Sequence, residues 1–176
     1  MPLSIQEIAN TDMENIDRIG KLRYDVWKAE GALEVSYFPV GSWTDPFDYS
    51  GRHWVVVNSD TGDFVAAARL NFLVDLDEQS RDVLLWKRTG NIIPLPTVDF
   101  GRLVVNADNR RQGLAHRLNE IRIVAAQEMG ARSIIVTASV GNVSLLKKSG
   151  FFEIGQRIEF DERPGVSFTA MQKNLV

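Results

Sequence analysis

The chain reads Arg-Leu-Val-Val at residues 102–105 and Asn-Arg-Arg-Gln-Gly-Leu-Ala at residues 109–115. The first stretch is a β-branched apolar run that stops at a polar turn, and the second opens an amphipathic helix. The first backbone N–H groups of a helix lack internal partners and lie at the positive end of its dipole. A strand, an arginine- and glycine-bearing loop and a helix in this order therefore predict a backbone site for an anion such as phosphate.

Residues 110–115 resemble motif A of the GCN5-related N-acetyltransferases (GNATs), which runs Arg or Gln, two residues, Gly, one residue, then Gly or Ala. The Arg-Leu-x-Val strand precedes the loop at the distance usual in that family. The resemblance implies acetyl-CoA or another acyl-CoA as co-substrate, with its pyrophosphate on the loop and its pantetheine arm paired with the preceding strand. The cofactor-binding residues implied are Leu103, Val104, Val105, Arg110, Arg111, Gln112, Gly113, Leu114, Ala115, His116 and Asn142.

Two purely structural explanations are alternatives to these assignments. The loop could be a tight strand-to-helix turn with solvated arginines, and Asn142 could be a helix N-cap, a position that Asn suits. Other phosphate loops fit less well, because the chain has neither the Gly-Lys-Ser/Thr of a P-loop nor a GxGxxG fingerprint.

Size and composition limit the functions to consider. The chain has 176 residues, a formal net charge of −3 and no cysteine. We expect one domain over residues 1–176, no disulfide or thiolate metal site, and no metal. The net charge argues against nucleic acid as the main partner. The start lacks a secretory signal pattern, and no apolar run approaches the ~18 residues of a membrane helix, so the expected location is the cytoplasm.

The periodicity of apolar residues predicts an alternating set of strands and helices. Expected strands cover residues 3–8, 53–57, 64–74, 98–105, 133–137, 151–160 and 166–172. The first expected helix begins at a capping box of Thr11 and Glu14 and ends near Gly31. Three further helices are expected over residues 75–88, 114–129 and 142–148. Gly101 inside its strand predicts a bulge or a close backbone approach.

This order resembles the acetyltransferase core over essentially the whole chain. The fold class expected is α/β, with a single mixed, mostly antiparallel sheet flanked by helices in the order β-α-(α)-β-β-β-α-β-α-β-β. Residues 75–97 form an insertion relative to that core. They could shape the acceptor pocket, make a subunit contact, or simply pack. A homodimer is compatible with these surfaces.

Acyl transfer to an amine requires a base for the ammonium proton, a stabiliser for the oxyanion and a leaving thiolate. Asp99 is the first candidate base, because it stands where many GNATs place a glutamate before Arg-Leu-x-Val. A structural Asp–Arg pair is the alternative. His53, at the head of a strand, is the second candidate. The family's tyrosine, which can protonate the thiolate, is replaced by Leu146, which cannot donate a proton. Water or one of the N-terminal tyrosines, Tyr24, Tyr37 and Tyr49, would have to serve instead.

The N-terminal half carries a second resemblance, to the acyl-homoserine-lactone synthases, which share the acetyltransferase fold. It rests on a polar constellation that joins Asp99 and Arg102 and is implied to bind substrate: Arg23, Trp27, Asp45, Asp48 and Arg69. Those synthases use S-adenosylmethionine as acceptor and usually an acyl carrier protein as donor. Each of these residues could instead belong to a surface or structural ion pair.

Three functions follow from these patterns. The first is an N-acyltransferase that moves an acetyl or short acyl group from acetyl-CoA to a primary amine of a small molecule or peptide by direct attack. The second is a synthase-like enzyme that uses S-adenosylmethionine, and the third is a non-catalytic CoA-binding regulatory domain.

Overall fold

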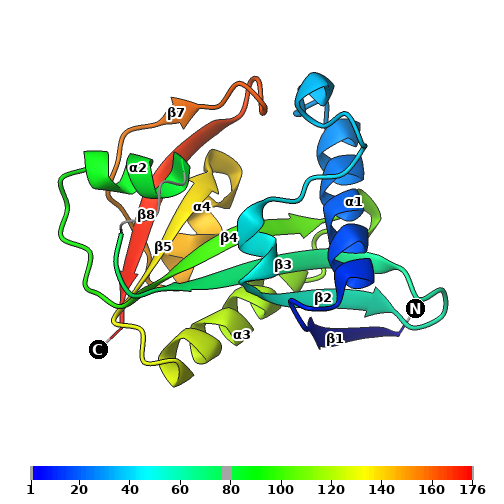
Figure 1. Ribbon diagram of the computed structural model, residues 1–176, viewed down its shortest axis with the longest axis horizontal. Helices are drawn as coiled ribbons and strands as arrows, with labels where there is room; N and C mark the ends of the chain where they lie inside the picture. The colour runs from blue at the N-terminus through cyan, green and yellow to red at the C-terminus, as the bar shows by residue number, and fades with distance from the viewer. Residues whose placement is uncertain (1, 77–80, 176) are drawn as a thin grey trace.

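In the computed structural model, which describes residues 2–76 and 81–175, a central sheet has helices on both faces (Figure 1). The strands are β1 (Leu3–Ile8), β2 (Arg52–Asn58), β3 (Phe64–Leu73), β4 (Thr97–Val105), β5 (Ser133–Ser139), β6 (Phe152–Glu153), β7 (Ile158–Glu159) and β8 (Ser167–Asn174). The α-helices are α1 (Met13–Ala29), α2 (Arg81–Arg88), α3 (Leu114–Glu128) and α4 (Val140–Lys148). Short 3₁₀ helices cover Val35–Tyr37, Pro46–Tyr49 and Ala107–Asn109.

The strand order is β1-β2-β3-β4-β5-β8-β6, and β7 also pairs with β8. Within the described residues, β4 and β5 pair in parallel, and the other neighbouring strands pair antiparallel. A parallel pair needs a crossover connection, which α3 supplies between β4 and β5. The expected α/β class with one mixed, mostly antiparallel sheet is therefore confirmed.

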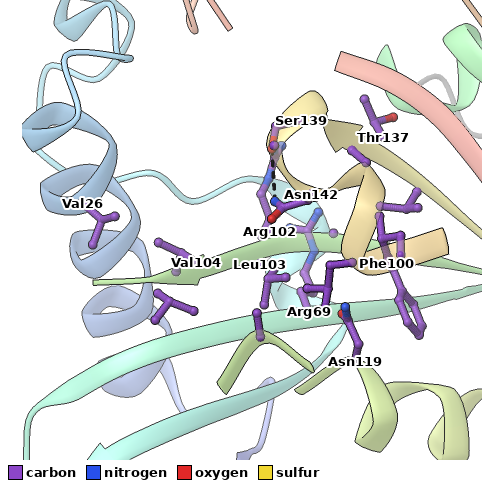
Figure 2. A pocket seen from close by; sticks show the side chains of 18 of the residues that line it. Val26, Arg69, Phe100, Arg102, Leu103, Val104, Asn119, Thr137, Ser139 and Asn142 are labelled. Atoms are coloured by element: carbon purple, nitrogen blue, oxygen red, sulfur yellow. Dashed lines mark hydrogen bonds between the residues drawn. The ribbon is translucent and has the colours of Figure 1, made fainter. Parts of the chain in front are cut away.

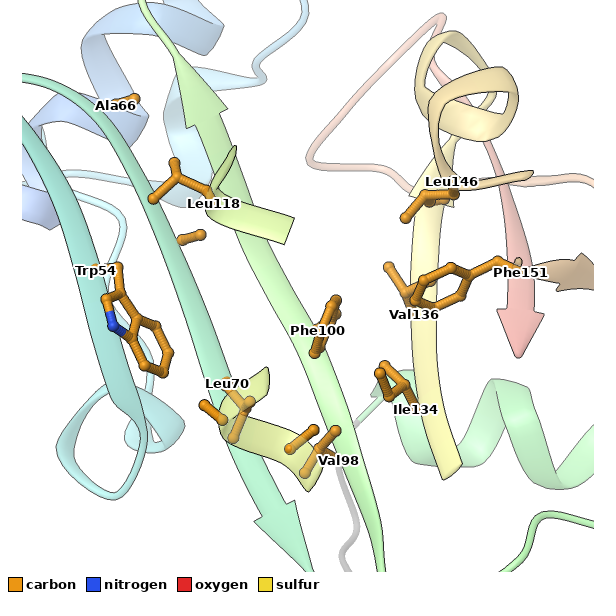
Figure 3. Close-up of a cluster of buried hydrophobic side chains, with 14 of the residues drawn as sticks. Trp54, Ala66, Leu70, Val98, Phe100, Leu118, Ile134, Val136, Leu146 and Phe151 are labelled. Carbon is orange, nitrogen blue, oxygen red and sulfur yellow. The ribbon is translucent and has the colours of Figure 1, made fainter. Parts of the chain in front are cut away.

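The two faces of the sheet carry separate apolar cores. Trp54 and Val56 of β2 pack toward α3, whereas Val55 and Val57 pack toward α1, as the two-residue period of a strand requires. Figure 3 shows the α3-side core, where side chains of β4 and β5 meet Leu118 and residues that follow β5. Because both faces are covered, β2 carries an unbroken apolar run from Trp54 to Val57.

Helix α1 buries the face that its apolar periodicity predicts: Ile16, Ile19, Arg23, Val26 and Trp27 are all buried. The expected capping box is wrong. Asp12 is the N-cap, because its carboxylate accepts a hydrogen bond from the backbone N–H of Asn15 at 3.1 Å. A carboxylate at this position satisfies one of the free N–H groups of the first turn.

The insertion forms α2, which lies over β5 and β8. The expected helix over residues 75–88 is observed from Arg81, and residues 77–80 lie outside the described part of the chain. Trp86 is almost fully buried, and its indole N–H donates to Thr137 Oγ at 3.2 Å. Val83 packs beside it against Ile135. The insertion therefore covers a sheet face that would otherwise be exposed.

Two expectations about the C-terminal part need correction. The continuous strand expected over residues 151–160 is wrong: in this stretch the short strands β6 and β7 each pair with β8, and the chain between them leaves the ladder. Gly155 lies in this segment, where an added Cβ would lie 3.2 Å from Thr89 Cγ2 and 3.3 Å from Ala170 Cβ. Helix α4 begins two residues earlier than expected, with Ser139 as its N-cap, so Asn142 is not the cap. Its Nδ2 donates back to Ser139 Oγ at 3.1 Å.

Candidate active site

The site begins where β4 and β5 separate. The two strands pair only at Thr97–Ser133, Val98–Ile134 and Asp99–Ile135. Beyond the last pair, residues 100–105 of β4 and 136–139 of β5 both line a cavity of about 570 Å³ (Figure 2). Strands that diverge leave backbone groups without a ladder partner, and these groups are available to a bound ligand.

A β-bulge next to this point shapes β4. The β3–β4 register shifts between the pairs Ala67–Val104 and Arg69–Gly101, and Arg102 has a φ of 56°. The close approach expected at Gly101 is also present: a Cβ there would lie 3.2 Å from Arg69 Nη2. From the other face, Arg122 of α3 donates through Nη1 to the carbonyls of Arg69 and Gly101, at 2.8 and 3.2 Å. The bulge is thus held from both sides.

The loop between β4 and α3 forms one end of the cavity. Arg111 and Gly113 both have positive φ, 63° and 75°, and Gly113 is the N-cap without any side-chain cap. Of the cofactor residues expected from the sequence, Gln112 is absent from the cavity lining. The others line it: Leu103, Val104, Val105, Arg110, Arg111, Gly113, Leu114, Ala115, His116 and Asn142.

Arg110 already has partners on the protein. Its Nε donates to the carbonyl of Val105 at 3.1 Å, and its Nη2 pairs with Glu30 at the end of α1. This links the loop to the helix across the mouth of the cavity. His116 lies 4.0 Å from Glu120, one helical turn along α3.

Asp99 lies at the point of divergence and is buried. Burial, followed by the nearby carboxylate of Asp82, raises the pKa of Asp99 to about 7, against the opposing effect of Arg69 and Arg102. Asp82 of α2 also lines the cavity. The sequence analysis missed Asp82, because only the fold brings the insertion to this edge of the sheet.

His53 lies away from this point, contrary to its assignment as a base. It is fully buried and is absent from the cavity lining. Its Nε2 lies 2.8 Å from the carbonyl oxygen of Asp48. Desolvation lowers the pKa of His53 to about 4, so the ring is neutral near pH 7. A buried neutral histidine outside the cavity has no route to the ammonium proton of an acceptor.

The polar residues of the N-terminal half form one buried arginine–aspartate network, which consists of Arg23, Asp45, Asp48, Arg69 and Arg102. Asp48 accepts from Arg23 Nη1 and Arg69 Nη1, each at 2.9 Å. Asp45 pairs with both Arg69 and Arg102: its Oδ1 lies 2.6 Å from Arg69 Nη1, and its Oδ2 lies 2.8 Å from Arg102 Nη2. These partners hold the pKa of both carboxyl groups below the usual range, although burial alone would raise it.

Within this network only Arg69 and Arg102 line the cavity, and Trp27 lines it from α1. Arg23, Asp45 and Asp48 lie behind them. The aspartates therefore position the arginines that face the cavity. Arg102 also lies over the ring of Trp43, 5.1 Å from its centroid.

A further arginine, Arg163, closes the cavity on the side of the C-terminal hairpin. Its Nε donates to the carbonyl of Ala32 at 2.6 Å, and its guanidinium stacks 4.5 Å from the ring centroid of Trp27. Burial lowers the pKa of Arg163 to about 10. No sequence pattern marked this residue, because its partners are more than a hundred positions away.

Leu146 is buried among the apolar side chains of the α3-side core. Tyr24, Tyr37 and Tyr49 are absent from the described cavity lining.

No described helix is long and apolar enough to cross a membrane. Among residues 2–76 and 81–175, no group of three or more acidic or histidine side chains is placed to hold a metal ion.

Comparison with known proteins adds evidence on the family and the fold. Residues 91–175 match the family described as Acetyltransferase (GNAT) domain. No curated protein sequence matches the chain. The acyl-CoA N-acyltransferase from Pseudomonas aeruginosa has a similar structure, with a TM-score of 0.66, 18% identity and coverage of 98% of this chain and 99% of that one.

Two further solved structures share the fold. The CoA-dependent acyl-homoserine lactone synthase BjaI, with MTA, gives a TM-score of 0.75 at 15% identity, covering 99% of this chain and 84% of that one. The NatC complex bound to Gag peptide and CoA gives 0.63 at 16% identity, with both chains covered completely. Residues 91–175 thus match an acetyltransferase (GNAT) domain in sequence, and the whole described chain has the fold that these acyltransferase structures share.

Proposed function

We propose that residues 1–176 form one acyl-CoA N-acyltransferase domain. It would move an acetyl or short acyl group from acetyl-CoA, or a similar acyl-CoA, to a primary amine of a small molecule or peptide. The observation that carries the proposal is the placement of Asp99. A carboxylate whose pKa is raised to about 7 lies at the point where the parallel strands separate, beside the cavity.

The donor would bind along β4 and the loop that follows it. The N–H groups at the start of α3 carry no side-chain cap, and Arg111 adds positive charge at the cavity wall. A pyrophosphate fits such a helix start. The amides of pantetheine would pair with the backbone of residues 103–105, which have no β5 partner. Asn142 would contact the same arm from α4.

The reaction follows from these placements. Asp99 takes a proton from the acceptor ammonium, directly or through water, and the free amine attacks the thioester carbonyl. A backbone N–H near Val104 stabilises the oxyanion. The attacking nitrogen loses its second proton to water, and the intermediate collapses to an amide as the C–S bond breaks and the CoA thiolate leaves. A thiol has a reference pKa near ~8.5, so water can protonate the thiolate where Leu146 replaces the usual tyrosine.

Calorimetric titration with acetyl-CoA tests the donor site. We expect micromolar binding by the wild-type protein and its loss in the double variant Arg111→Glu, Gly113→Asp, which adds negative charge to the loop. Arg117→Glu makes the same charge reversal as Arg111→Glu, on an exposed residue of α3 outside the cavity lining, so it should retain binding. A folded wild-type protein that binds no acyl-CoA would refute the proposal.

A synthase-like activity is the second candidate, and the arginine–aspartate network favours it. The network brings together the residues on which the resemblance to acyl-homoserine-lactone synthases rests, and a CoA-dependent synthase shares the fold at a TM-score of 0.75. The acceptor would then be S-adenosylmethionine. Release of methylthioadenosine on incubation with acyl-CoA and S-adenosylmethionine separates this activity from simple N-acylation.

The remaining alternatives have their own tests. A non-catalytic CoA-binding regulatory domain would bind acetyl-CoA without turnover for any amine, and turnover unaffected by Asp99→Ala would remove the role given to Asp99. An acyl carrier protein as donor is a further proposal, which competition between acyl carrier protein and acyl-CoA would test. A homodimer is another, which analytical sedimentation would test. We place the enzyme in the cytoplasm, where acyl-CoA donors are formed.

A further inference from the structure

The floor of the cavity carries a buried amide whose orientation is fixed. Asn119 of α3 is fully buried and lines the cavity. Its Oδ1 accepts from Arg122 Nη2 at 2.5 Å. Because a guanidinium only donates hydrogen bonds, Oδ1 must be the acceptor and Nδ2 must be the other amide atom. Within the described residues Nδ2 has no hydrogen-bond partner.

A second unpartnered donor belongs to Arg122. This side chain is 1% exposed and also lines the cavity. Its hydrogen bonds reach neutral oxygens, namely two backbone carbonyls and the Asn119 amide. Among the described residues, its Nε has no acceptor. Burying a donor without an acceptor is costly, so two such groups on side chains that line one cavity would be stabilised by a ligand oxygen.

The walls around these donors are apolar. Phe100, Val136 and Leu146 are buried side chains of the lining, and Phe100 packs against Phe151 with ring centroids 5.9 Å apart. Figure 2 shows Asn119 extending from α3 toward the part of β4 that carries Phe100 and Leu103. Figure 3 shows Phe100 on β4, with Val136, Leu146 and Phe151 on the side of β5. The floor therefore suits a short group that ends in an oxygen.

We propose that the acyl donor carries a short acyl group with a second oxygen beyond the thioester carbonyl, and that Asn119 is the residue that selects it. The Nδ2 of Asn119 and the Nε of Arg122 would donate to a keto, hydroxyl or carboxylate oxygen of this group. An acyl chain attached to a thioester beside β4 reaches this floor through the gap between the diverging strands. The inference rests on the proposed function and names its donor class.

Calorimetry with four CoA thioesters and free CoA tests the proposal without a known acceptor. Butyryl-CoA is the reference, 3-oxobutyryl-CoA and 3-hydroxybutyryl-CoA carry a neutral oxygen, and malonyl-CoA carries a carboxylate. Asn119→Asp keeps the oxygen that accepts from Arg122 but replaces the donor with an acceptor. Glu120→Gln changes the next residue of α3, which is absent from the cavity lining and is half exposed. Thermal melting checks that both variants fold.

We expect at least one oxygen-bearing thioester to bind the wild-type protein roughly tenfold more tightly than butyryl-CoA, as one hydrogen bond to a buried donor would give. The analogue that binds best shows whether the second oxygen of the acyl group is a neutral oxygen or belongs to a carboxylate. The preference should fall to near equality in Asn119→Asp and persist in Glu120→Gln.

If the wild-type protein binds CoA but shows no preference, the inference is overturned and the proposed function stands. A preference that survives Asn119→Asp overturns the role of Asn119, and failure of CoA and every thioester to bind overturns both proposals.

Discussion

Asp99 lies opposite Ile135 in the last registered pair between β4 and β5, and the cavity begins immediately beyond it. The side chains of these strands alternate between the two faces, so Asp99 and Gly101 project to the same face as Arg69. The same pair of residues thus ends the parallel ladder and places a buried carboxyl group at the edge of the cavity.

Replacing Asp99 with Asn should lower acyl transfer by ~100-fold or more, because the amide cannot accept the ammonium proton. In the wild-type protein kcat/KM should rise with pH as Asp99 loses its proton near pH 7, and should level off above it. Thiol release measured from pH 5.5 to 9 gives this profile. Acetyl-CoA affinity serves as the control, and an Asn variant with full activity would contradict the assignment.

Asp82→Asn should move the pH profile to lower pH. The Asp82 carboxylate raises the pKa of Asp99, so its removal makes Asp99 ionise more readily. The same thiol-release assay would show the midpoint shift downward. Asp60→Asn, in the exposed turn between β2 and β3, is the matched control and should leave the midpoint in place. An unchanged midpoint in Asp82→Asn would show that the two carboxyl groups do not interact.

Asp48→Asn should destabilise the fold by about 3–5 kcal/mol, since Arg23 and Arg69 would keep buried charges with their shared partner removed. Urea unfolding at pH 7 measures the loss. Asp25→Asn, which breaks an exposed pair with Lys21, should cost less than ~1 kcal/mol. Because the folded-state pKa of Asp48 is lowered, its contribution is present above about pH 4 and is lost as the pH falls below that value.

His53→Gln should flatten the dependence of stability on pH between about 4 and 6.5. In the wild-type protein the unfolded state takes up a proton near pH 6.5, whereas the folded state does so only near pH 4. Stability therefore falls as the pH is lowered through this window, by up to roughly 3 kcal/mol. Urea unfolding at several pH values measures the slope. Equal slopes in the two proteins would show that His53 is accessible to protons.

Gly101→Ala should destabilise the protein by about 1–3 kcal/mol, because the new methyl group would lie 3.2 Å from Arg69 Nη2 and 3.3 Å from Arg69 Nε. Displacing Arg69 would also disturb its bonds to Asp45 and Asp48. Gly141→Ala offers a matched control in α4, since nothing lies within 4 Å of its new Cβ. Thermal unfolding of the two variants should differ clearly, and equal melting temperatures would argue against the crowding.

Part of the site could be predicted from the sequence because it depends on neighbouring residues. The strand over residues 98–105, the loop with Gly113 and the helix that follows are encoded by local periodicity and by backbone geometry. The buried face of α1 follows from the spacing of its apolar residues in the same way. Arg122 gave a signal that went unused, since it follows Leu118 by four residues on the buried face of α3.

The sequence by itself thus determined the fold class and predicted the phosphate-type loop, because short-range hydrogen bonding and apolar periodicity are properties of contiguous residues. The candidate Asp99 came from the resemblance to the acetyltransferases. Only the tertiary structure decided that Arg23 and Asp48, 25 positions apart, share a buried ion pair, and that Asp82 reaches the cavity while His53 does not. Such contacts depend on how sheet faces and helices pack, and burial then sets the charge state of each group. For that reason the place of Asp82 at the cavity and the buried donors of Asn119 and Arg122 became visible only in the folded chain.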